Sequence, residues 1–267
     1  MTDTLALARP LRPWLFWGFV VLMLALTVLF CLLGKWQLDR LAWKEGLIAT
    51  VAQRMHMSAI PLPPVGEWVG FDAETYAYRP VTATGHFLND QAVRVFTGLE
   101  DAKGRYSGPG YWIMTPFAID GGGTVFVDRG FVPQAVGVAY ANDKSGPQGT
   151  VTVTGIGMIS EEASAFTPGP DGPNRIEWLR NIDRLKAMTA PALAPFADIY
   201  IDMPAGAPGA LPQGGETSIE FPNNHLGYAY TWFGFAIVTP IMLIVWILRQ
   251  RRGKPPARRP PKGQLAV

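Results

Sequence analysis

Two long, uncharged, apolar runs constrain this chain more than any other feature of its sequence. They cover residues 14–33 and 228–248, which are 20 and 21 residues long. At about 1.5 Å per helical residue, each run is long enough to cross a hydrocarbon core of roughly 30 Å. Charged residues make up only 16% of the chain, whereas a soluble domain typically carries about 25%. The sequence therefore predicts a membrane protein with two transmembrane helices, and residues 34–227 are numerous enough to form one buried core.

The distribution of charge predicts how the chain is oriented. The segments outside the two runs at either end hold nine basic residues and one acidic residue, whereas residues 34–227 hold fourteen basic and twenty acidic residues. Because Lys and Arg near the ends of membrane spans are retained in the cytoplasm, both termini should be cytoplasmic and the central domain should be periplasmic. A nucleic-acid-binding arm is the alternative for the basic C-terminus, but topology and anionic lipid explain it better.

Further features of the runs agree with membrane spans. Aromatic residues stand near their ends, as in the interfacial belts of spanning helices: Trp14, Trp17, Trp36, Trp43, Tyr228, Tyr230, Trp232 and Trp246. The first run is too long for a cleaved signal and no small-residue cleavage site follows it. Cys31 is the single cysteine; bulky neighbours argue against a lipoprotein site, so we expect it to pack inside the span.

Between the spans, the pattern first indicates a helix and then a sheet. Apolar residues recur three or four apart beyond Gly34, so the first helix should continue as an amphipathic extension to about Met55. From Tyr78 the period becomes two. Gly121–Gly123 should form a hairpin turn and Asn181–Met188 a short helix. The expected strands are Arg79–Phe87, Ala92–Thr97, Tyr111–Ile119, Thr124–Phe131, Thr150–Ile159 and Ile199–Asp202.

These elements predict a fold class and a domain plan. The fold is a membrane protein whose two transmembrane helices flank a mainly antiparallel β domain that is barrel-like, α+β overall and extracytoplasmic. No βαβ rhythm favours a dinucleotide fold. The domain plan is a cytoplasmic segment 1–13, a first span 14–33, a helical extension 34–60, a β-rich domain 61–224, a second span 225–248 and a basic disordered tail 249–267.

Common catalytic motifs are missing from the sequence. It contains no phosphate-binding loop, no H-E-x-x-H, no C-x-x-C and no G-x-S-x-G. Its histidines, His56, His86 and His225, are far apart, so no local zinc cluster is encoded. His86 should be a hydrogen-bonded sheet residue, and the neighbours Asp128 and Arg129 at a strand end are more typical of a fixed loop than of catalysis.

A histidine at the start of the second span is the strongest candidate site residue. We expect Asn223 or Asn224 to accept hydrogen bonds from amides in the first turn, with His225 directly after them. The electropositive helix start and partial desolvation both favour a neutral imidazole, which is the form that ligates metals. Tyr228 and Trp232 follow three and seven residues later, on the same helix face.

An amphipathic porphyrin would suit this place. Its iron would be bound by His225, its ring would lie against Tyr228 and Trp232, and its propionates would meet bases such as Arg129 or Lys35. A structural histidine, with its hydrogen bonds satisfied at the membrane interface, is the alternative.

Five blocks of the sequence resemble one known family in the same order. They are Leu33-Gly34-Lys35-Trp36-Gln37-Leu38-Asp39-Arg40 with Lys44, Thr84-Gly85-His86-Phe87, Gly108-Pro109-Gly110-Tyr111, Val127-Asp128-Arg129-Gly130-Phe131-Val132-Pro133 and Asn223-Asn224-His225-Leu226-Gly227-Tyr228 with the residues up to Phe233. The family is Surfeit locus protein one, or Surf-one, a family of cytochrome c oxidase assembly factors. Asp128 and Phe131 stand where the family often has Asn and Trp.

The resemblance implies a function. The chain should assist the insertion of haem a into subunit I of an aa3-type cytochrome c oxidase, without being an enzyme. The family histidine that matches His225 is implicated in binding haem a, transiently and through the iron. Partners would be oxidase subunit I, haem a synthase, other assembly factors and the lipid bilayer, but no nucleic acid. The short N-terminus lacks a transit peptide, which favours a bacterial inner membrane.

Two other classes of function stay open. One is a haem-independent membrane scaffold that stabilises an immature oxidase subunit. The other is a membrane-tethered hydrolase, although no local motif supports a Ser/His/Asp triad.

Overall fold

The computed structural model describes residues 12–142, 146–216 and 223–252. These residues form two compact units, a helical unit that comprises residues 12–48 and 223–252, and a β domain that comprises residues 49–142 and 146–216. Most of the predicted N-terminal segment (residues 1–11) and most of the predicted basic tail (residues 253–267) lie outside the described residues.

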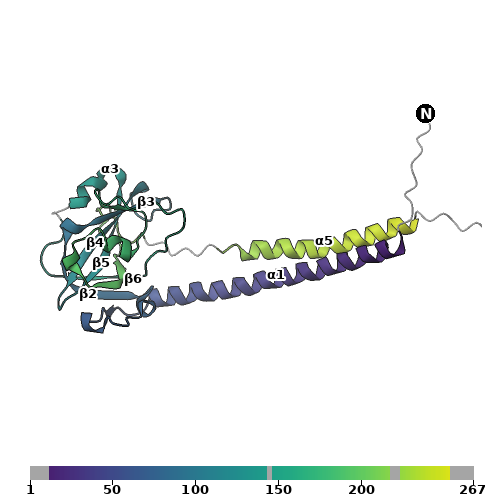
Figure 1. Ribbon diagram of the computed structural model, residues 1–267, viewed down its shortest axis with the longest axis horizontal. Coiled ribbons are helices and arrows are strands. Elements are labelled where there is room, and N and C mark those ends of the chain that lie inside the picture. Colours follow the sequence, from purple (N-terminus) through teal and green to yellow (C-terminus); the bar gives the residue numbers. More distant parts are fainter. Residues whose placement is uncertain (1–11, 143–145, 217–222, 253–267) are drawn as a thin grey trace, which may run out of the picture. The chain divides into compact units, whose positions relative to one another are not determined.

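The helical unit consists of two long antiparallel helices that lie side by side (Figure 1). Helix α1 spans Pro13–Met55 without interruption, which confirms that the first predicted span continues into an extension ending at Met55. Helix α5 spans His225–Arg252, so it starts at the predicted residue and runs four residues past the predicted end of the span. Aromatic contacts join the helices along their length, with Phe16 stacked on Trp246 and Phe30 stacked on Trp232.

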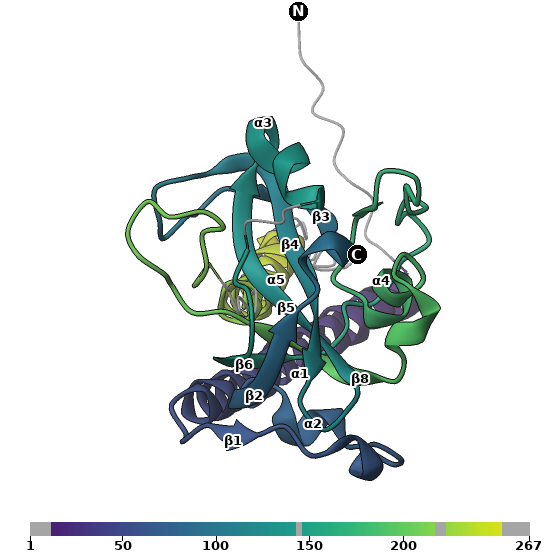
Figure 2. The same ribbon diagram turned by 90° about the vertical axis from the view of Figure 1, so that its left-hand side faces the viewer.

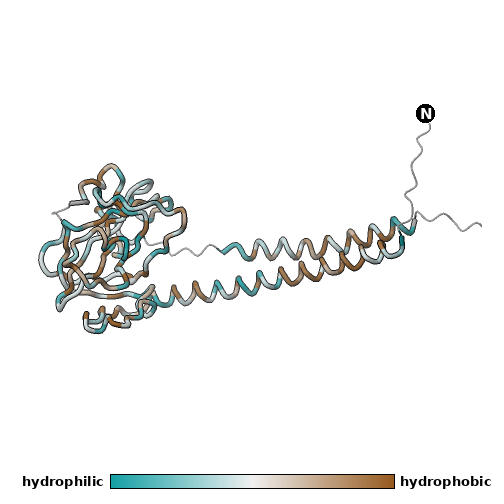
Figure 3. The backbone as a smooth tube through the Cα atoms, viewed as in Figure 1, coloured by the Kyte–Doolittle hydropathy of each residue, from teal (hydrophilic) through white to brown (hydrophobic). Residues whose placement is uncertain are grey.

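The apolar surface of both helices faces outward. None of the most apolar 18-residue window of α1 is buried, and only 17% of that of α5 is. Figure 3 shows hydrophobic residues along both helices. Because a core helix of a soluble protein would bury such a stretch, two exposed apolar helices long enough to cross a bilayer fit a membrane protein.

The position of Cys31 inside the first span is as expected. Cys31 lies in α1, but its thiol is exposed. Only one face of α1 is covered by α5, and Cys31 is not on that face although its neighbour Phe30 contacts Trp232.

The last turns of α1 belong to the β domain. Val51 is buried there, and Arg54 donates from Nη1 to the carbonyl oxygens of Glu74 and Ala77, at 2.9 and 3.5 Å. The carbonyl of Glu74 lies in the short helix α2, Ala73–Tyr76. The amphipathic extension therefore ends on the domain.

The β domain contains eight strands among its described residues. All six predicted strands are present, and the Gly121–Gly123 turn joins two of them as predicted. The predicted helix at Asn181–Met188 is α4, Ile182–Lys186, for which the Asn181 side chain accepts from the amide of Arg184. The sequence did not indicate β1, β7 or α3. The strands are β1 Ile60–Pro61, β2 Pro80–Phe87, β3 Val93–Leu99, β4 Gly108–Ile119, β5 Thr124–Pro133, β6 Val151–Met158, β7 Ile176–Glu177 and β8 Phe196–Asp202, and α3 is Gln134–Gly137.

Five of the strands close into a barrel. The order is β2–β6–β8–β5–β4, and β4 pairs back with β2 at Gly85 to Phe87. Within this ring β5 and β8 run parallel, whereas the other four pairs are antiparallel. Strand β3 extends β4 on the outside of the ring (Figure 2), and the short β7 pairs with β3. The mainly antiparallel, barrel-like α+β fold is thereby confirmed, with one parallel pair in the ring and two more where β1 and β7 join the sheet.

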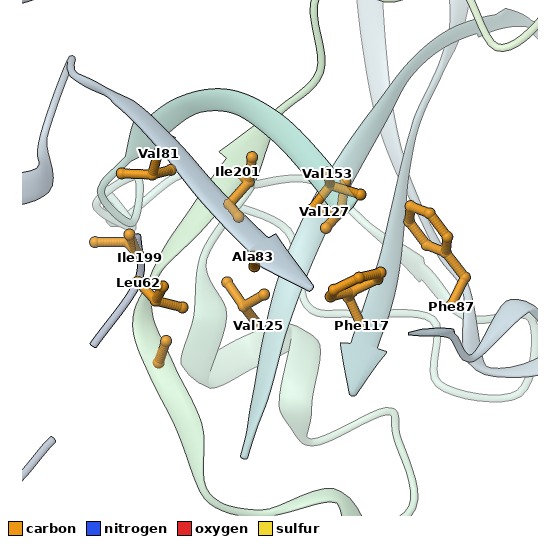
Figure 4. Packing of buried hydrophobic residues seen from close by; sticks show 11 residues of the cluster. Leu62, Val81, Ala83, Phe87, Phe117, Val125, Val127, Val153, Ile199 and Ile201 are labelled. Atoms are coloured by element: carbon orange, nitrogen blue, oxygen red, sulfur yellow. The ribbon is translucent and has the colours of Figure 1, made fainter. Parts of the chain in front are cut away.

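Strand β5 is buried on both of its faces. Val125 and Val127 point into the barrel, where they meet the alternate residues of β2 and β8 (Figure 4). Phe126 points the other way, into a second cluster that β3 and α4 cover. Since side chains alternate along a strand, Asp128 shares the outer face of β5 with Phe126. The carboxylate of Asp128 is therefore fully buried.

Candidate functional site

His225 is the first residue of α5, and its side chain is half-buried. The amide of Tyr228 donates to the Asn224 carbonyl, so the backbone of Asn224 caps the helix. Among the described residues, neither asparagine side chain accepts from a first-turn amide, and Asn223 Oδ1 is buried without a hydrogen-bond partner. Phe221 and Pro222, part of the same sequence block, lie outside the described residues.

One nitrogen of the His225 ring is held by the other long helix. Nδ1 of His225 lies 2.7 Å from Oε1 of Gln37. The side chain of Gln37 is only 8% exposed, whereas that of the preceding residue in α1, Trp36, is largely exposed. The second nitrogen, Nε2, has no hydrogen-bond partner among the described residues. The contact thus orients the imidazole, ties α1 to α5 and leaves one ring nitrogen uncommitted.

The two aromatic residues expected beside His225 differ in their surroundings. Tyr228 is 57% exposed, so its ring is available to a flat apolar ligand or to lipid. Trp232 is stacked on Phe30, with ring centroids 5.8 Å apart, and contacts Phe235 edge-on. Ala229, on the same face, is buried. The face that these residues share with His225 is therefore partly covered by α1.

The two candidate propionate partners belong to different units. Lys35 lies in the helical unit, two residues before Gln37, and forms an exposed ion pair with Asp39 in which Nζ and Oδ2 are 2.7 Å apart. Arg129 is a half-buried residue of the β domain. Its Nη1 donates to Oδ1 of Asn89 at 3.4 Å, and its guanidinium lies 5.8 Å from the ring centroid of Phe87. A role for Arg129 beside a porphyrin stays a prediction.

The donor set at His225 suits a metal that brings most of its own ligands. The part of the chain that the structure describes contains no group of three or more His, Cys, Asp or Glu side chains that could hold a bare metal ion. A haem iron, by contrast, needs only an axial ligand from the protein. A single half-exposed imidazole with one nitrogen uncommitted meets that requirement.

A group of charged side chains lies inside the β domain around Arg180. Arg180 Nη1 is 3.4 Å from Oδ2 of Asp128 and 3.9 Å from Oδ2 of Asp202, and Nη2 is 2.9 Å from Oε1 of Glu161. Oδ1 of Asp128 also accepts from the amide of Gly130 at 3.0 Å. The expectation that Asp128 stands at a strand end is wrong, because Asp128 lies inside β5 and its side chain holds the backbone of Gly130. Its cationic partner is Arg180.

Burial changes the protonation of this cluster. It raises the pKa of Asp128 to about 7, helped by the nearby Asp202 and opposed by Arg180. Burial acts in the opposite sense on Arg180, but the surrounding acidic groups outweigh it and hold the pKa of Arg180 above its usual range. The ion pair links β5 and β8 to the segment before α4, which is a structural role.

Of the predicted site residues, His225, Tyr228 and Trp232 lie together in α5. The structure adds Gln37 of α1 as a partner of His225. Gln37 lies three residues after Gly34 in the first of the resembling blocks, but nothing about it alone marks it as a partner of His225. A signal was available in the spacing, because residues three apart share a helix face and a glycine in a long helix indicates a close approach. His86, in β2, is exposed.

Comparison with known proteins places the chain in a family. The sequence matches the SURF1 family over residues 24–237. A SURF1-like protein of Monosiga brevicollis is 31% identical over 266 residues, which cover 92% of this chain and 94% of the relative. Surfeit locus protein 1 of Mus musculus is 32% identical over 219 residues, covering 78% and 68%, and that of Homo sapiens is 29% identical over 237 residues, covering 84% and 74%.

The matched region contains both halves of the site, since Gln37 and His225 fall within it. It also includes the whole described β domain and the resembling blocks from which the family was predicted. The chain therefore belongs to the SURF1 family.

Proposed function

We propose that this protein is an assembly factor for an aa3-type cytochrome c oxidase that binds haem a through His225 and assists its insertion into subunit I. Membership of the SURF1 family supports the role in oxidase assembly. The single observation that supports haem binding is the half-buried imidazole at the start of α5, with Nδ1 held by Gln37 and Nε2 uncommitted.

The position of His225 along the helices suits an amphipathic ligand. From Trp17 to Gln37 is a rise of about 30 Å at 1.5 Å per residue, which equals the thickness of a hydrocarbon core. Both Trp17 and Trp36 are largely exposed, as interfacial tryptophans are. His225, beside Gln37, would therefore lie at the membrane surface, where the apolar ring of a porphyrin and its charged propionates find matching surroundings.

The residues of the chain would have distinct parts in such a carrier. The haem would bring its iron and four ring nitrogens, and His225 would supply an axial ligand. Tyr228 offers an exposed ring beside it, whereas Trp232 supports the helix pair through Phe30. Lys35, in the same helical unit as His225, is the proposed propionate partner. One axial imidazole at a partly open place releases its cargo more readily than a closed site with two ligands.

The spectrum of the purified protein tests this function. The full chain is purified from cells that make haem a, and its Soret band and haem content are compared with those of His225→Ala. We expect haem in the wild type and a loss of at least about tenfold in the variant, because the axial ligand is missing. An unchanged Soret band in His225→Ala contradicts the role of His225.

The same purification tests the alternative. A wild type without haem, together with oxidase activity that is lost on deletion of the gene, favours the haem-independent scaffold. Full aa3 oxidase activity after deletion contradicts both forms of the proposal.

We also propose that the β domain is periplasmic and both termini are cytoplasmic, in a bacterial inner membrane. Antiparallel α1 and α5 put the described ends of the chain on one side. The test replaces Cys31 by Ser, introduces Gly172→Cys or Arg251→Cys at exposed positions, and adds a membrane-impermeant maleimide to intact cells. Labelling of residue 172 and not residue 251 is expected, and the reverse pattern overturns the orientation.

A further inference from the structure

We infer that Gln37 is the positioning residue of the haem site: its side-chain oxygen selects the tautomer of His225 that carries the proton on Nδ1 and presents Nε2 to the iron. The inference rests on the proposed function, since it names how the proposed axial ligand is prepared. Gln37 itself touches no haem in this proposal.

The contact between the two side chains is short and well placed for this role. Oε1 of Gln37 is 2.7 Å from Nδ1 of His225, within the range of a strong hydrogen bond. An amide oxygen can only accept, so the imidazole nitrogen that faces it must carry the proton. In a neutral imidazole the other nitrogen then keeps its lone pair, and that lone pair is the one that binds iron.

The surroundings of Gln37 keep this arrangement in place. Its side chain is 8% exposed, so water competes little for the hydrogen bond. Three residues earlier, Gly34 meets the ring of Phe233 on α5, which brings the two helices close on this face. A rigid helix pair, and not a loop, therefore sets the distance between Gln37 and His225.

An amide is a suitable partner for a carrier that must release its cargo. Metal-binding histidines usually donate their second N–H to a carboxylate or a carbonyl, and a carboxylate raises the basicity of the ligand most. A neutral oxygen fixes the orientation of the ring but donates less electron density. Gln37 would thus give a correctly oriented yet modestly basic ligand.

The first experiment needs no haem. The ring nitrogens of His225 are observed by ¹⁵N NMR in the full chain in detergent micelles, at a pH where the imidazole is neutral. Wild type is expected to show a protonated Nδ1 and an unprotonated Nε2. Gln37→Leu, which removes the acceptor, should lose this preference, whereas Gln37→Glu, which keeps an oxygen, should retain it. A wild type with the proton on Nε2 overturns the inference.

The second experiment measures the ligand itself, with hemin (ferric iron protoporphyrin IX) as the probe. The affinity of Gln37→Leu is expected to fall by about 10- to 100-fold, the usual effect of losing the partner of a metal-binding histidine. The reduction potential of hemin bound to Gln37→Leu should be higher than that of hemin bound to wild type, because the imidazole donates less electron density to the iron. Gln37→Glu should restore binding and lower the potential below that of wild type.

Controls separate a positioning role from a structural one. Gln53→Leu makes the same substitution at an exposed residue of α1 and should leave affinity and potential unchanged. In the His225→Ala background, Gln37→Leu should have no further effect, because the two residues act through one interaction.

Failure of the inference and failure of the proposed function give different results. If His225→Ala loses hemin but Gln37→Leu binds it with wild-type affinity and potential, the inference is wrong and the function stands. If His225→Ala binds hemin as wild type does, the proposed function is wrong, and the role of Gln37 falls with it. Should Gln37→Leu fail to fold, the reduction potentials of hemin bound to Gln37→Glu and to wild type are compared. Equal potentials then contradict the inference, and a lower potential in Gln37→Glu supports it.

Discussion

Gly34 of α1 lies directly against the ring of Phe233 of α5. A Cβ atom added at Gly34 would be 2.8 Å from both Cε1 and Cζ of that ring, closer than such atoms normally approach. Both residues belong to blocks through which the sequence resembles its family, and the structure shows that these distant blocks meet. Small residues let apolar helices approach closely in a membrane, where van der Waals packing contributes much of the association free energy.

The first prediction concerns this contact. Gly34→Leu should lower the free energy of unfolding of the helix pair by about 1–3 kcal/mol, the usual cost of overpacking. Thermal unfolding of the full chain in detergent measures the change. The control is Gly18→Leu, also in α1, where an added Cβ meets open space. If Phe233→Ala does not recover part of the loss in a double variant, the ring is not the cause.

A second prediction concerns the buried ion pairs of the β domain. Arg180→Met should destabilise the protein by about 3–5 kcal/mol at neutral pH, because it leaves Asp128 and Asp202 buried without a cation. Urea unfolding of the full chain measures it. Lys186→Met breaks the exposed pair with Asp183 and should cost less than about 1 kcal/mol. Equal losses in the two variants would contradict the importance of burial.

A third prediction follows from the pKa of Asp128. It is about 7 in the folded protein against 3.8 for an unperturbed carboxyl, so the folded state holds a proton between these pH values that the unfolded state has released. Stability from this group is therefore greatest below about pH 4 and declines as pH rises to 7, by at most about 1.4 kcal/mol per pH unit.

Asp128→Asn tests this dependence, because the amide has nearly the same shape and does not titrate. Unfolding free energies of wild type and variant are measured at pH 5, 6, 7 and 8. We expect the stability of wild type relative to the variant to decrease from pH 5 to pH 7. A constant difference across the series would show that Asp128 is ionised throughout.

The fourth prediction concerns the seam that closes the barrel. Gly85 of β2 pairs with Ile119 of β4, and a Cβ at this position would lie 2.0 Å from the carbonyl oxygen of Ala118. Backbone cannot move aside as a flexible side chain can, so Gly85→Ala should lower the unfolding free energy by at least about 1–3 kcal/mol.

The matched variant for this seam is Gly98→Ala, also in a strand, where nothing lies within 4 Å of the added atom. Chemical denaturation of both variants compares them. If Gly85→Ala were as stable as Gly98→Ala, the close approach of the β4 backbone at Gly85 would not limit the residue at this position.

Local sequence patterns were enough to predict the long helices, six strands and one short helix of this protein, and its family. An uncharged apolar run of 20 residues or more is typical of a spanning helix, so α1 and α5 were predicted within a few residues. Alternation of apolar and polar residues located six strands, and Asn181 marked the start of α4. These features depend on periods of two and 3.6 residues and on helix caps, all of which are written within a few neighbouring positions.

The tertiary structure alone decided which distant residues meet. The closure of β4 on β2, the parallel seam of β5 with β8, and the contacts of Gln37 with His225 and of Arg180 with Asp128 join positions far apart in the chain. Gln37 and His225 are separated by 188 positions, and no local pattern encodes such a distance. The packing of whole elements sets these pairs, because a helix or strand can present one residue only by fixing the places of all the others.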